Sequence, residues 1–421
     1  MARRRGGLGP AYHRLWTAAA VSTLGDGMYL AALPLLAAEL THDPLAVSAV
    51  TFAGWLPWLL FALPAGALVD RLDRRRAMWT VDATRALVVG GLTVAVLAGW
   101  ASIPLLAVAG FLVGAGQTLF ENAAQAMVVA VVGRDPRRLD RANGQLVASL
   151  TVGQQLVGPP AGSAASALAA WLPFLADAVS FGASAGLVAS IRGRFRPDGA
   201  AGGSVAGRSL RAEIAEGLRF LFRRRLLRAA VLLVSASNLA FMAGEAILVL
   251  FASEELGLGS RGYGLLLAAV AVGGVPGSLL AARVSERVPP GPLIVGGVLA
   301  GAAAMAWFGL ATDPWLAGVA YAATGAVWGV WNVTLLSLRQ SIVPDRLMGR
   351  VVGAVRLIGF GTIPVGALLG GLVARTLGLR APFLGGAVVL AVAALAAAPV
   401  ITTGAVRAAR AEAAAGATRP G

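Results

Sequence analysis

Twelve apolar runs, each about 20 residues long or longer, follow one another along the chain. A helix of roughly 20 residues crosses the ~30 Å hydrocarbon core of a bilayer, so each run predicts one membrane-spanning helix. The first run is too long for the apolar region of a cleaved signal peptide, and we interpret it as a retained span. The sequence thus predicts an all-α polytopic membrane protein, with transmembrane helices at residues 15–40, 46–69, 77–99, 103–132, 143–166, 171–191, 226–252, 262–282, 292–311, 315–338, 351–374 and 381–402.

The composition agrees with this class and excludes several chemistries. Hydrophobic residues make up 57% of the chain and charged residues 13%, about half the charged share of a soluble domain. The chain contains no cysteine, which excludes disulfides and thiolate metal sites, and its two histidines form no cluster. A phosphate-binding loop that ends in Gly-Lys-Ser/Thr needs a lysine, and the chain has none. We therefore expect no metal, no cofactor, no enzymatic activity and no direct use of ATP.

The net charge of +15 comes from arginines in every second connection between the runs. This alternation follows the positive-inside rule and argues against a nucleic-acid-binding surface. We therefore predict a bacterial inner-membrane protein with both termini in the cytoplasm. The arginine-bearing segments are 1–14, 70–76, 133–142, 192–225, 283–291, 339–350 and 403–421.

A long linker divides the runs into two sets of six. We expect an N-terminal bundle at residues 1–192, a cytoplasmic linker at 193–225 and a C-terminal bundle at 226–421. Within the linker, apolar residues recur at helical spacing over 208–225, which predicts an amphipathic helix on the inner membrane surface. The halves also show a faint repeat at an offset of 209 residues, which pairs Arg141, Gly144 and Gly162 with Arg350, Gly353 and Gly371.

A short charged loop between the second and third runs is a candidate gate. Its glycine permits close helix approach, and its acid could meet the N-terminal end of span 11, or Arg141, in one transport state. We predict that Asp70→Asn slows transport and leaves insertion and substrate binding largely intact. The gating residues assigned here are Gly66, Asp70, Arg71, Arg74, Arg75 and Arg141.

This loop resembles the signature of the major facilitator superfamily, although Asp73 stands where many members carry a second glycine. The resemblance covers the whole chain. Three further segments resemble the branch that includes siderophore and macrolide exporters: Leu24–Gly27, Leu139–Gly144 and Glu213–Leu221. The resemblance implies two pseudo-symmetric six-helix bundles, alternating access, and a central cavity lined by spans 1, 4, 7 and 10.

Span 5 also resembles the glycine-proline motif of antiporters within the superfamily. Its glycines and prolines include Gly153, Gly158, Pro159 and Gly162. The spacing after the second glycine is one residue longer than usual, and Ser163 replaces the final glycine. We expect a break in the helix at Pro159, with Gly158 and Gly162 forming a face for close packing. A kink backed by such a contact could seal a path, so these three residues are also gating candidates. Ordinary packing between spans is the alternative.

Asp26 is the first candidate for proton coupling. It lies eleven residues into span 1, about 16 Å along the helix and close to the bilayer midplane. An ionisable side chain in hydrocarbon is costly and thus a functional candidate. Asp26 could bind and release a proton or could balance the charge of a cationic substrate. The alternative is a structural pair with a buried arginine such as Arg85.

The other polar candidates lie in spans 4, 7 and 10. Residues four or seven apart share a helix face and could line a cavity. For span 4 the alternative is a structural bond, and for Glu245 it is an interfacial position. Trp328 and Trp331 could stack on a hydrophobic substrate, or they could serve packing or face lipid. These candidates are Gln117, Glu121, Asn122, Asn238, Glu245, Trp328 and Asn332.

Two further groups are expected to be structural. Asp82 and Arg85 are three residues apart on span 3 and should neutralise each other. Asp177 lies near the outer end of span 6, where we expect it to be hydrated.

Together these features predict a monomeric secondary transporter that exports small hydrophobic compounds in exchange for protons. Its partners would be a small-molecule substrate, protons and the lipid bilayer. Three alternatives remain: a dedicated exporter of an endogenous metabolite such as a siderophore, an importer or facilitator, and a non-transporting membrane scaffold or receptor.

Overall fold

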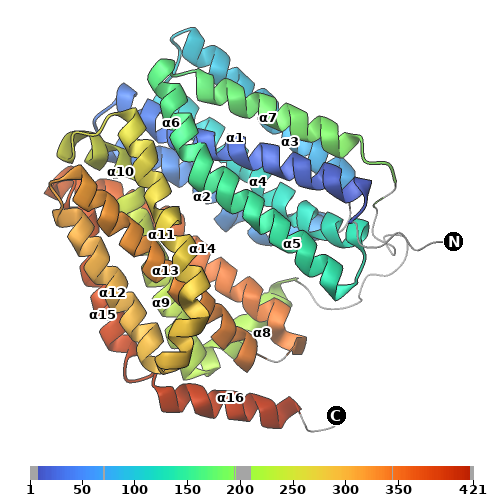
Figure 1. Cartoon of the computed structure of the whole chain (residues 1–421), viewed down its shortest axis with the longest axis vertical. Coiled ribbons are helices and arrows are strands. Elements are labelled where there is room, and N and C mark those ends of the chain that lie inside the picture. Colours follow the sequence, from blue (N-terminus) through green and yellow to red (C-terminus); the bar gives the residue numbers. More distant parts are fainter. Residues whose placement is uncertain (1–7, 70–71, 194, 196–209, 344, 418–421) are drawn as a thin grey trace. The chain divides into compact units, whose positions relative to one another are not determined.

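The computed structural model describes residues 8–69, 72–193, 195, 210–343 and 345–417, and within these its regular elements are helices. The first part of the chain forms α1 (Pro10–Leu40), α2 (Pro44–Val69), α3 (Arg74–Leu97), α4 (Ile103–Val132), α5 (Pro136–Leu150), η1 (Thr151–Val157), α6 (Gly158–Leu168) and α7 (Leu172–Ala189) (Figure 1). The second part forms α8 (Leu210–Arg223), α9 (Arg225–Glu245), α10 (Leu248–Leu250), η2 (Phe251–Glu255), α11 (Ser260–Arg287), α12 (Pro290–Leu310), α13 (Pro314–Ile342), α14 (Asp345–Leu377), α15 (Ala381–Ala397) and α16 (Thr403–Ala417).

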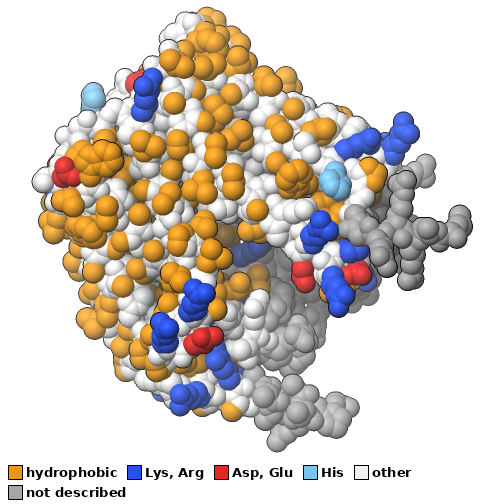
Figure 2. Space-filling view, viewed as in Figure 1, with side chains coloured by type: hydrophobic (Ala, Val, Ile, Leu, Met, Phe, Trp, Pro, Cys, Tyr) orange, Lys and Arg blue, Asp and Glu red, His pale blue; other side chains and the backbone are white. Residues whose placement is uncertain are grey.

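The membrane-protein class predicted from the apolar runs is confirmed. Among the described residues, ten helices are long and apolar enough to cross a bilayer, and α15 is apolar but shorter. The predicted span at 143–166 is a series of three elements, α5, η1 and α6. Hydrophobic side chains are spread widely over the face shown in Figure 2, and charged ones are few. Large side chains such as Leu87 and Trp315 are 78% and 84% exposed, which suits a surface that faces lipid rather than water.

The helices pack into two compact units. The first comprises residues 1–42, 53–204 and 259–268, and the second comprises residues 43–52, 205–258 and 269–421. In the first unit α7 packs on α1 and α3, and α4 packs on α3. In the second unit α15 packs on α9 and α12, and α13 packs on α12. The contacts among α9, α12, α13 and α15 therefore repeat those among α1, α3, α4 and α7.

The helix break predicted in span 5 takes the form of a π-helical segment, η1. Pro159 and Pro160 lack the backbone N–H that would continue an α-helical ladder. The N–H of Gly158 instead bonds to the carbonyl of Gly153, five residues back. A π-helical turn of this kind often marks a functional position in a helix.

Small residues after this break bring α6 against α1. A Cβ atom added to Gly158 would lie 2.6 Å from Cα of Gly27, and one added to Gly162 would lie 2.5 Å from Cα of Met28. Side chains at these two positions would collide with the α1 backbone, which cannot move aside as a flexible side chain can. The two glycines thus hold the neighbourhood of Asp26 tightly against α6.

The helix α16 was not anticipated. Its sequence, within residues 403–421, indicates only an arginine-bearing terminal segment. In the structure α16 packs against α12 and α13. Arg410 Nε bonds to Ser341 Oγ at 3.2 Å, and Arg224 Nη2 pairs with Glu412 Oε1 at 3.3 Å. The helix is rich in alanine but too polar to be recognised as an apolar run. Contacts with the rest of the fold help to stabilise it.

Candidate functional site

A buried charged cluster lies between α1, α3 and α7 in the first unit. Arg85 of α3 is its centre, with 2% of its surface exposed. Its Nη2 lies 2.7 Å from Asp26 Oδ1, and its Nη1 lies 3.4 Å from Asp82 Oδ1. Asp26 is thus buried and engaged by Arg85, the pairing that the sequence analysis held as the alternative to a free midplane carboxylate. Asp82 and Arg85 also form the expected pair.

Asp177 of α7 adds a third carboxylate to this cluster. The expectation that it is hydrated is wrong, because its side chain is fully buried. Its Oδ1 accepts a hydrogen bond from Ser180 Oγ at 3.2 Å, whereas its Oδ2 bonds to no described residue. A Cβ atom on Gly25 would lie 2.5 Å from Asp177 Oδ1. The glycine beside Asp26 therefore leaves room for Asp177 to approach α1.

The polar face of α7 can be recognised from residue spacing in the sequence. Asp177, Ser180 and Ser184 are spaced three and four residues apart, so they share one helix face. Ser184 Oγ donates to Asp82 Oδ2 at 2.6 Å. This spacing could have indicated that Asp177 faces the protein interior, because polar side chains on one face of an apolar helix avoid lipid.

Two aromatic side chains, Phe181 and Tyr29, lie beside the charged groups of the cluster. The guanidinium carbon of Arg85 lies 3.8 Å from the ring centre of Phe181, a cation–π distance. The Tyr29 hydroxyl is buried and bonds to no described residue. With all groups ionised, the cluster would hold three carboxylates against one guanidinium. Burial of unbalanced charge is costly, and protons are counter-charges that such a site can take up and release.

The polar residues of α4 form a smaller arrangement beside the cluster. Gln117 Nε2 donates to Glu121 Oε1 at 2.9 Å, so these two side chains meet on one face. Asn122 Nδ2 instead donates to the Thr118 carbonyl of its own helix at 2.8 Å. A Cβ atom on Gly116 would lie 2.8 Å from Arg85 Cδ, which shows how closely α4 approaches the central arginine.

The structure describes only part of the predicted gate. Asp70 and Arg71 lie outside the described residues, and for Gly66 only its place in α2 is described. Arg74 Nη1 reaches the Ala126 carbonyl at 3.5 Å, and Arg75 Nη1 donates to the Ile191 carbonyl at 2.6 Å. These contacts link the start of α3 to α4 and to the segment after α7. Arg141 is exposed on α5, and its role in gating stays a prediction.

The candidate residues of the second unit separate into distinct environments. Glu245 is partly buried and accepts a hydrogen bond from the Tyr321 hydroxyl. Asn238 has a different partner from Glu245: its Nδ2 donates to the Gly359 carbonyl of α14 at 2.9 Å. Asn332 is exposed.

Trp328 and Trp331 belong to a stack of three nearly parallel rings. The ring centres of Phe241 and Trp328 are 6.1 Å apart with an interplanar angle of 14°, and those of Trp328 and Trp331 are 5.0 Å apart at 13°. Trp331 is 2% exposed and its Nε1 donates to the Ile294 carbonyl at 3.2 Å. Trp331 therefore anchors the stack, while Phe241 and Trp328 stay partly exposed.

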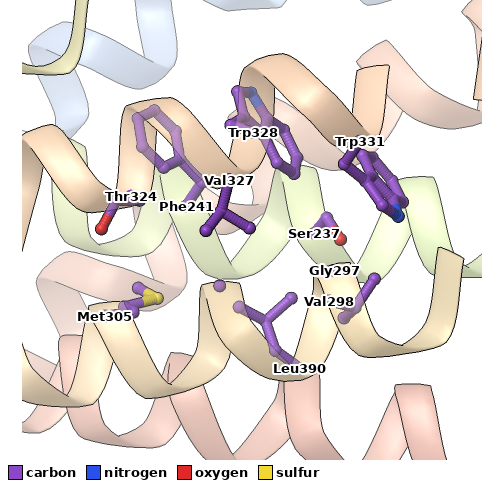
Figure 3. Close-up of a pocket in the computed structure, with 11 residues that line it drawn as sticks. Ser237, Phe241, Gly297, Val298, Met305, Thr324, Val327, Trp328, Trp331 and Leu390 are labelled. Atoms are coloured by element: carbon purple, nitrogen blue, oxygen red, sulfur yellow. The ribbon is translucent and has the colours of Figure 1, made fainter. Parts of the chain in front are cut away.

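A hollow lies beside these rings. Figure 3 shows Phe241, Trp328 and Trp331 with Met305 and Leu390 around it. An adjoining hollow shares Phe241, Met305 and Thr324 and also includes Glu245 and Tyr321. Both hollows are small, with room for little more than water, and their lining is mostly apolar apart from the Glu245 carboxylate in the second.

Comparison with known proteins agrees with this architecture. Residues 9–415 match a family described as transmembrane secretion effectors. The chain is 29% identical to the multidrug efflux pump Tap of Mycolicibacterium fortuitum over 87% of its length and 90% of the relative, and 29% identical to Tap of Mycobacterium tuberculosis over 90% and 91%. It also matches, at 25% identity over 86% of its length and 88% of the relative, an uncharacterised major facilitator-type transporter of Sinorhizobium fredii.

Solved structures show the same fold at low sequence identity. The nucleoside transporter NupG matches with a TM-score of 0.70 and 13% identity, over 93% of this chain and 99% of that one. A bacterial homologue of the iron transporter ferroportin matches with a TM-score of 0.71 and 15% identity, over 92% and 98%. Identities this low support the fold and leave the transported compound open.

Proposed function

Because this chain belongs to the family of transmembrane secretion effectors, multi-pass transporters of the major facilitator superfamily, we propose that it exports small hydrophobic compounds in exchange for protons. The relatives named as multidrug efflux pumps cover most of the chain and support the direction and the substrate class. We further propose that the protein acts as a monomer in the bacterial inner membrane with both termini in the cytoplasm, as the distribution of arginines favours.

The observation that carries proton coupling is the buried cluster of Asp26, Asp82, Arg85 and Asp177. A proton on Asp26 would replace the charge-assisted contact with Arg85, whose Nη2 lies 2.7 Å away. Arg85 would then keep Asp82 as a counter-charge. Proton binding and release would thus switch one strong contact between α1 and α3 while the rest of the cluster persists.

The packing of α6 on α1 supplies a route from this switch to helix movement. Gly27 and Met28 directly follow Asp26 and are the α1 residues that Gly158 and Gly162 approach. A shift of α1 at Asp26 would displace α6, because the two backbones are in contact and leave no space between them. The π-helical segment η1 before Gly158 is a suitable place for the resulting bend.

Proton movement in proteoliposomes under an imposed pH gradient tests the proposal. Wild type and Asp26→Asn would be compared against lipophilic cations, macrolides and siderophores, with Glu286→Gln as the control because Glu286 is an exposed acid on α11. We expect one compound class to drive proton flux in wild type and in the control, and Asp26→Asn to abolish it. If proton flux survives Asp26→Asn, Asp26 is not the coupling residue.

A further inference from the structure

We propose that Asp177 and Tyr29 form a second proton-binding site in the first unit, beside the pair of Asp26 and Arg85. In this site Asp177 binds the proton, and the Tyr29 hydroxyl is its hydrogen-bond partner in both protonation states. Tyr29 is thus a positioning residue, since it acts on the proton through Asp177. The inference rests on the proposed exchange of compounds for protons and deepens it, because the cluster then binds protons at two carboxyl groups.

Two buried polar atoms, one on α1 and one on α7, have no partner among the described residues. Tyr29 is 5% exposed, and its hydroxyl forms no hydrogen bond with them. Asp177 is fully buried, and its Oδ2 forms none either. Buried polar groups without partners are uncommon in folded proteins. The coupling step at Asp26 uses neither atom, so these two atoms are available for a separate role.

The packing of α7 on α1 brings the two groups into one region. The Tyr29 ring meets the Phe174 ring of α7 edge-on, with ring centres 6.0 Å apart and an interplanar angle of 80°. Phe174 and Asp177 are three residues apart and therefore share a face of α7. The charges of Asp177, Arg85 and Asp26 all act on the Tyr29 hydroxyl. A hydrogen bond, made directly or through one water, can therefore link this hydroxyl to Asp177.

The counter-charges of the cluster favour Asp177 as the carboxyl group that holds this proton. Arg85 contacts Asp26 at 2.7 Å and Asp82 at 3.4 Å, whereas Asp177 forms no ion pair with a residue that the structure describes. The charged groups that act on Asp177 are Asp26, Arg85 and Asp82, and α6, which also packs on α7, carries no titratable residue. Buried charge without a counter-ion is costly. A proton on Asp177 removes such a charge and breaks no contact with Arg85.

A tyrosine hydroxyl suits a group that changes its charge, because it can both donate and accept a hydrogen bond. When Asp177 is protonated, its O–H donates to the Tyr29 oxygen. When Asp177 is ionised, the Tyr29 O–H turns and donates to Oδ2. An arginine in this place would stabilise only the ionised form. The pair therefore lets Asp177 gain and lose a proton without leaving a buried polar atom unsatisfied.

The proton reaches and leaves this site past Asp26. Asp26 keeps 7% of its surface exposed, whereas Asp177 has none. On release, the O–H bond at Asp177 Oδ2 breaks, its electron pair stays on the carboxylate, and water beside Asp26 takes up the proton. Tyr29 keeps its own proton throughout. Asp26 therefore lies between the outside of the unit and the second site.

Infrared difference spectroscopy of the purified full chain in lipid nanodiscs tests the inference, because a protonated carboxyl group absorbs apart from a carboxylate. The pH would be changed with no transported compound and no pH gradient, and isotopic labelling of aspartate carboxyl carbons would identify aspartate bands. The variants are Asp177→Asn, Tyr29→Phe and Asp26→Asn. Tyr12→Phe is the matched control, since Tyr12 is a buried tyrosine of α1 about 21 Å from Asp26 along the helix, and its hydroxyl donates to the Ala142 carbonyl at 2.8 Å.

We expect wild type to show a protonated aspartate band that disappears as the pH rises. The band should be absent in Asp177→Asn and present in Asp26→Asn. Tyr29→Phe should move it to higher frequency, because the carboxyl group loses its hydrogen bond. The same variant should shift its disappearance to higher pH by about one unit, since the ionised form loses the stronger bond. Tyr12→Phe should match wild type in both respects.

Four results would overturn the inference: no protonated aspartate band in wild type, a band that persists in Asp177→Asn, a band that never titrates while the protein stays folded, or no response to Tyr29→Phe. Thermal unfolding of each variant shows whether the fold is retained. If Asp177→Asn unfolds, the response of the band to Tyr29→Phe decides the assignment.

This outcome is separable from that of the proposed function, because the spectra require no transport. A titrating band that responds to Tyr29→Phe supports the second site even if proteoliposomes show no compound-driven proton flux. Conversely, flux that is abolished by Asp26→Asn, in a protein without such a band, would leave the proposed function standing and limit the cluster to one proton-binding carboxyl group.

Discussion

The two units share a packing scheme and differ in what that scheme encloses. In the first, Gly162 of α6 approaches Met28 of α1, and in the second, Gly370 of α14 approaches Ala243 of α9, with Cβ-to-Cα distances of 2.5 and 2.6 Å if a side chain were added. Two residues before these contacts, α1 carries Asp26 while α9 carries Phe241. Gly162 thus corresponds in packing to Gly370, not to Gly371, with which the repeat at an offset of 209 residues paired it. Equivalent positions hold a carboxylate in one unit and an aromatic ring in the other.

The surroundings differ in the same way. Arg85 and three carboxylates occupy the interior of the first unit, whereas Phe251, Phe308 and Phe383 pack at ring-centre distances of 4.8 to 5.1 Å in the second. One helix arrangement can therefore support either a charged or an aromatic interior. We propose that this difference confines proton coupling to the first unit.

The removal of the central arginine should have the largest effect and should be confined to the first unit. Arg85→Met leaves Asp26 and Asp82 without the guanidinium that both contact. Loss of one partner of a buried pair typically costs about 3–5 kcal/mol, so we expect poor accumulation in the membrane and a lower unfolding temperature. Fluorescence-detected thermal unfolding would measure this. A change in the second unit, Phe241→Leu at the position equivalent to Asp26, should leave stability within about 1.5 kcal/mol of wild type.

The packing shared by the units predicts a matched pair of smaller losses. Gly162→Val and Gly370→Val each insert a side chain against backbone atoms, and overpacking of this kind costs about 1–3 kcal/mol. Both should lower the unfolding temperature to a similar extent. Gly182→Val is the control, because a Cβ atom there meets nothing within 4 Å. A loss in only one unit would contradict the equivalence of the two contacts.

The third carboxylate should matter for coupling more than for folding. Asp177→Asn keeps the shape of a fully buried side chain and removes one charge from an unbalanced cluster. We expect unchanged or higher thermal stability, with substrate-driven proton flux in proteoliposomes reduced about tenfold, equal to about 1.4 kcal/mol. Ser180→Ala, which removes a hydrogen bond to Asp177 Oδ1, is the control and should retain most of the flux. Wild-type flux in Asp177→Asn would mean that the coupling protons bind elsewhere in the cluster.

The sequence was sufficient for the fold class because bilayer thickness imposes a length and an apolar character on each span. It also singled out Asp26, since an acid within an apolar run is conspicuous. Hydropathy reports membrane depth and says little about which side chains meet. The contact of Asp177 with the α1 backbone depends on Gly25 and on the packing of α7 against α1, so the hydration expected for Asp177 was wrong.

For the helix break and the tryptophan pair, the sequence predicted only part of the observed structure. The prolines at 159 and 160 predicted an interrupted helix, but the bond from Gly158 to Gly153 that makes η1 is a property of the folded backbone. Trp328 and Trp331 were recognised as a pair because they share a helix. Their stack with Phe241 joins two helices, and sequence spacing within one helix carries no information about a ring on another.

The smallest expected effect concerns the base of the ring stack. Trp331→Phe keeps an aromatic ring and removes the Nε1 donor that bonds to the Ile294 carbonyl at 3.2 Å. Such a bond contributes about 1 kcal/mol net, so we expect a slightly lower unfolding temperature. Trp328→Phe, at a ring that is only partly buried, should lower the unfolding temperature less. If Trp328→Phe instead destabilised the protein more than Trp331→Phe, the tryptophan that anchors the stack would be Trp328.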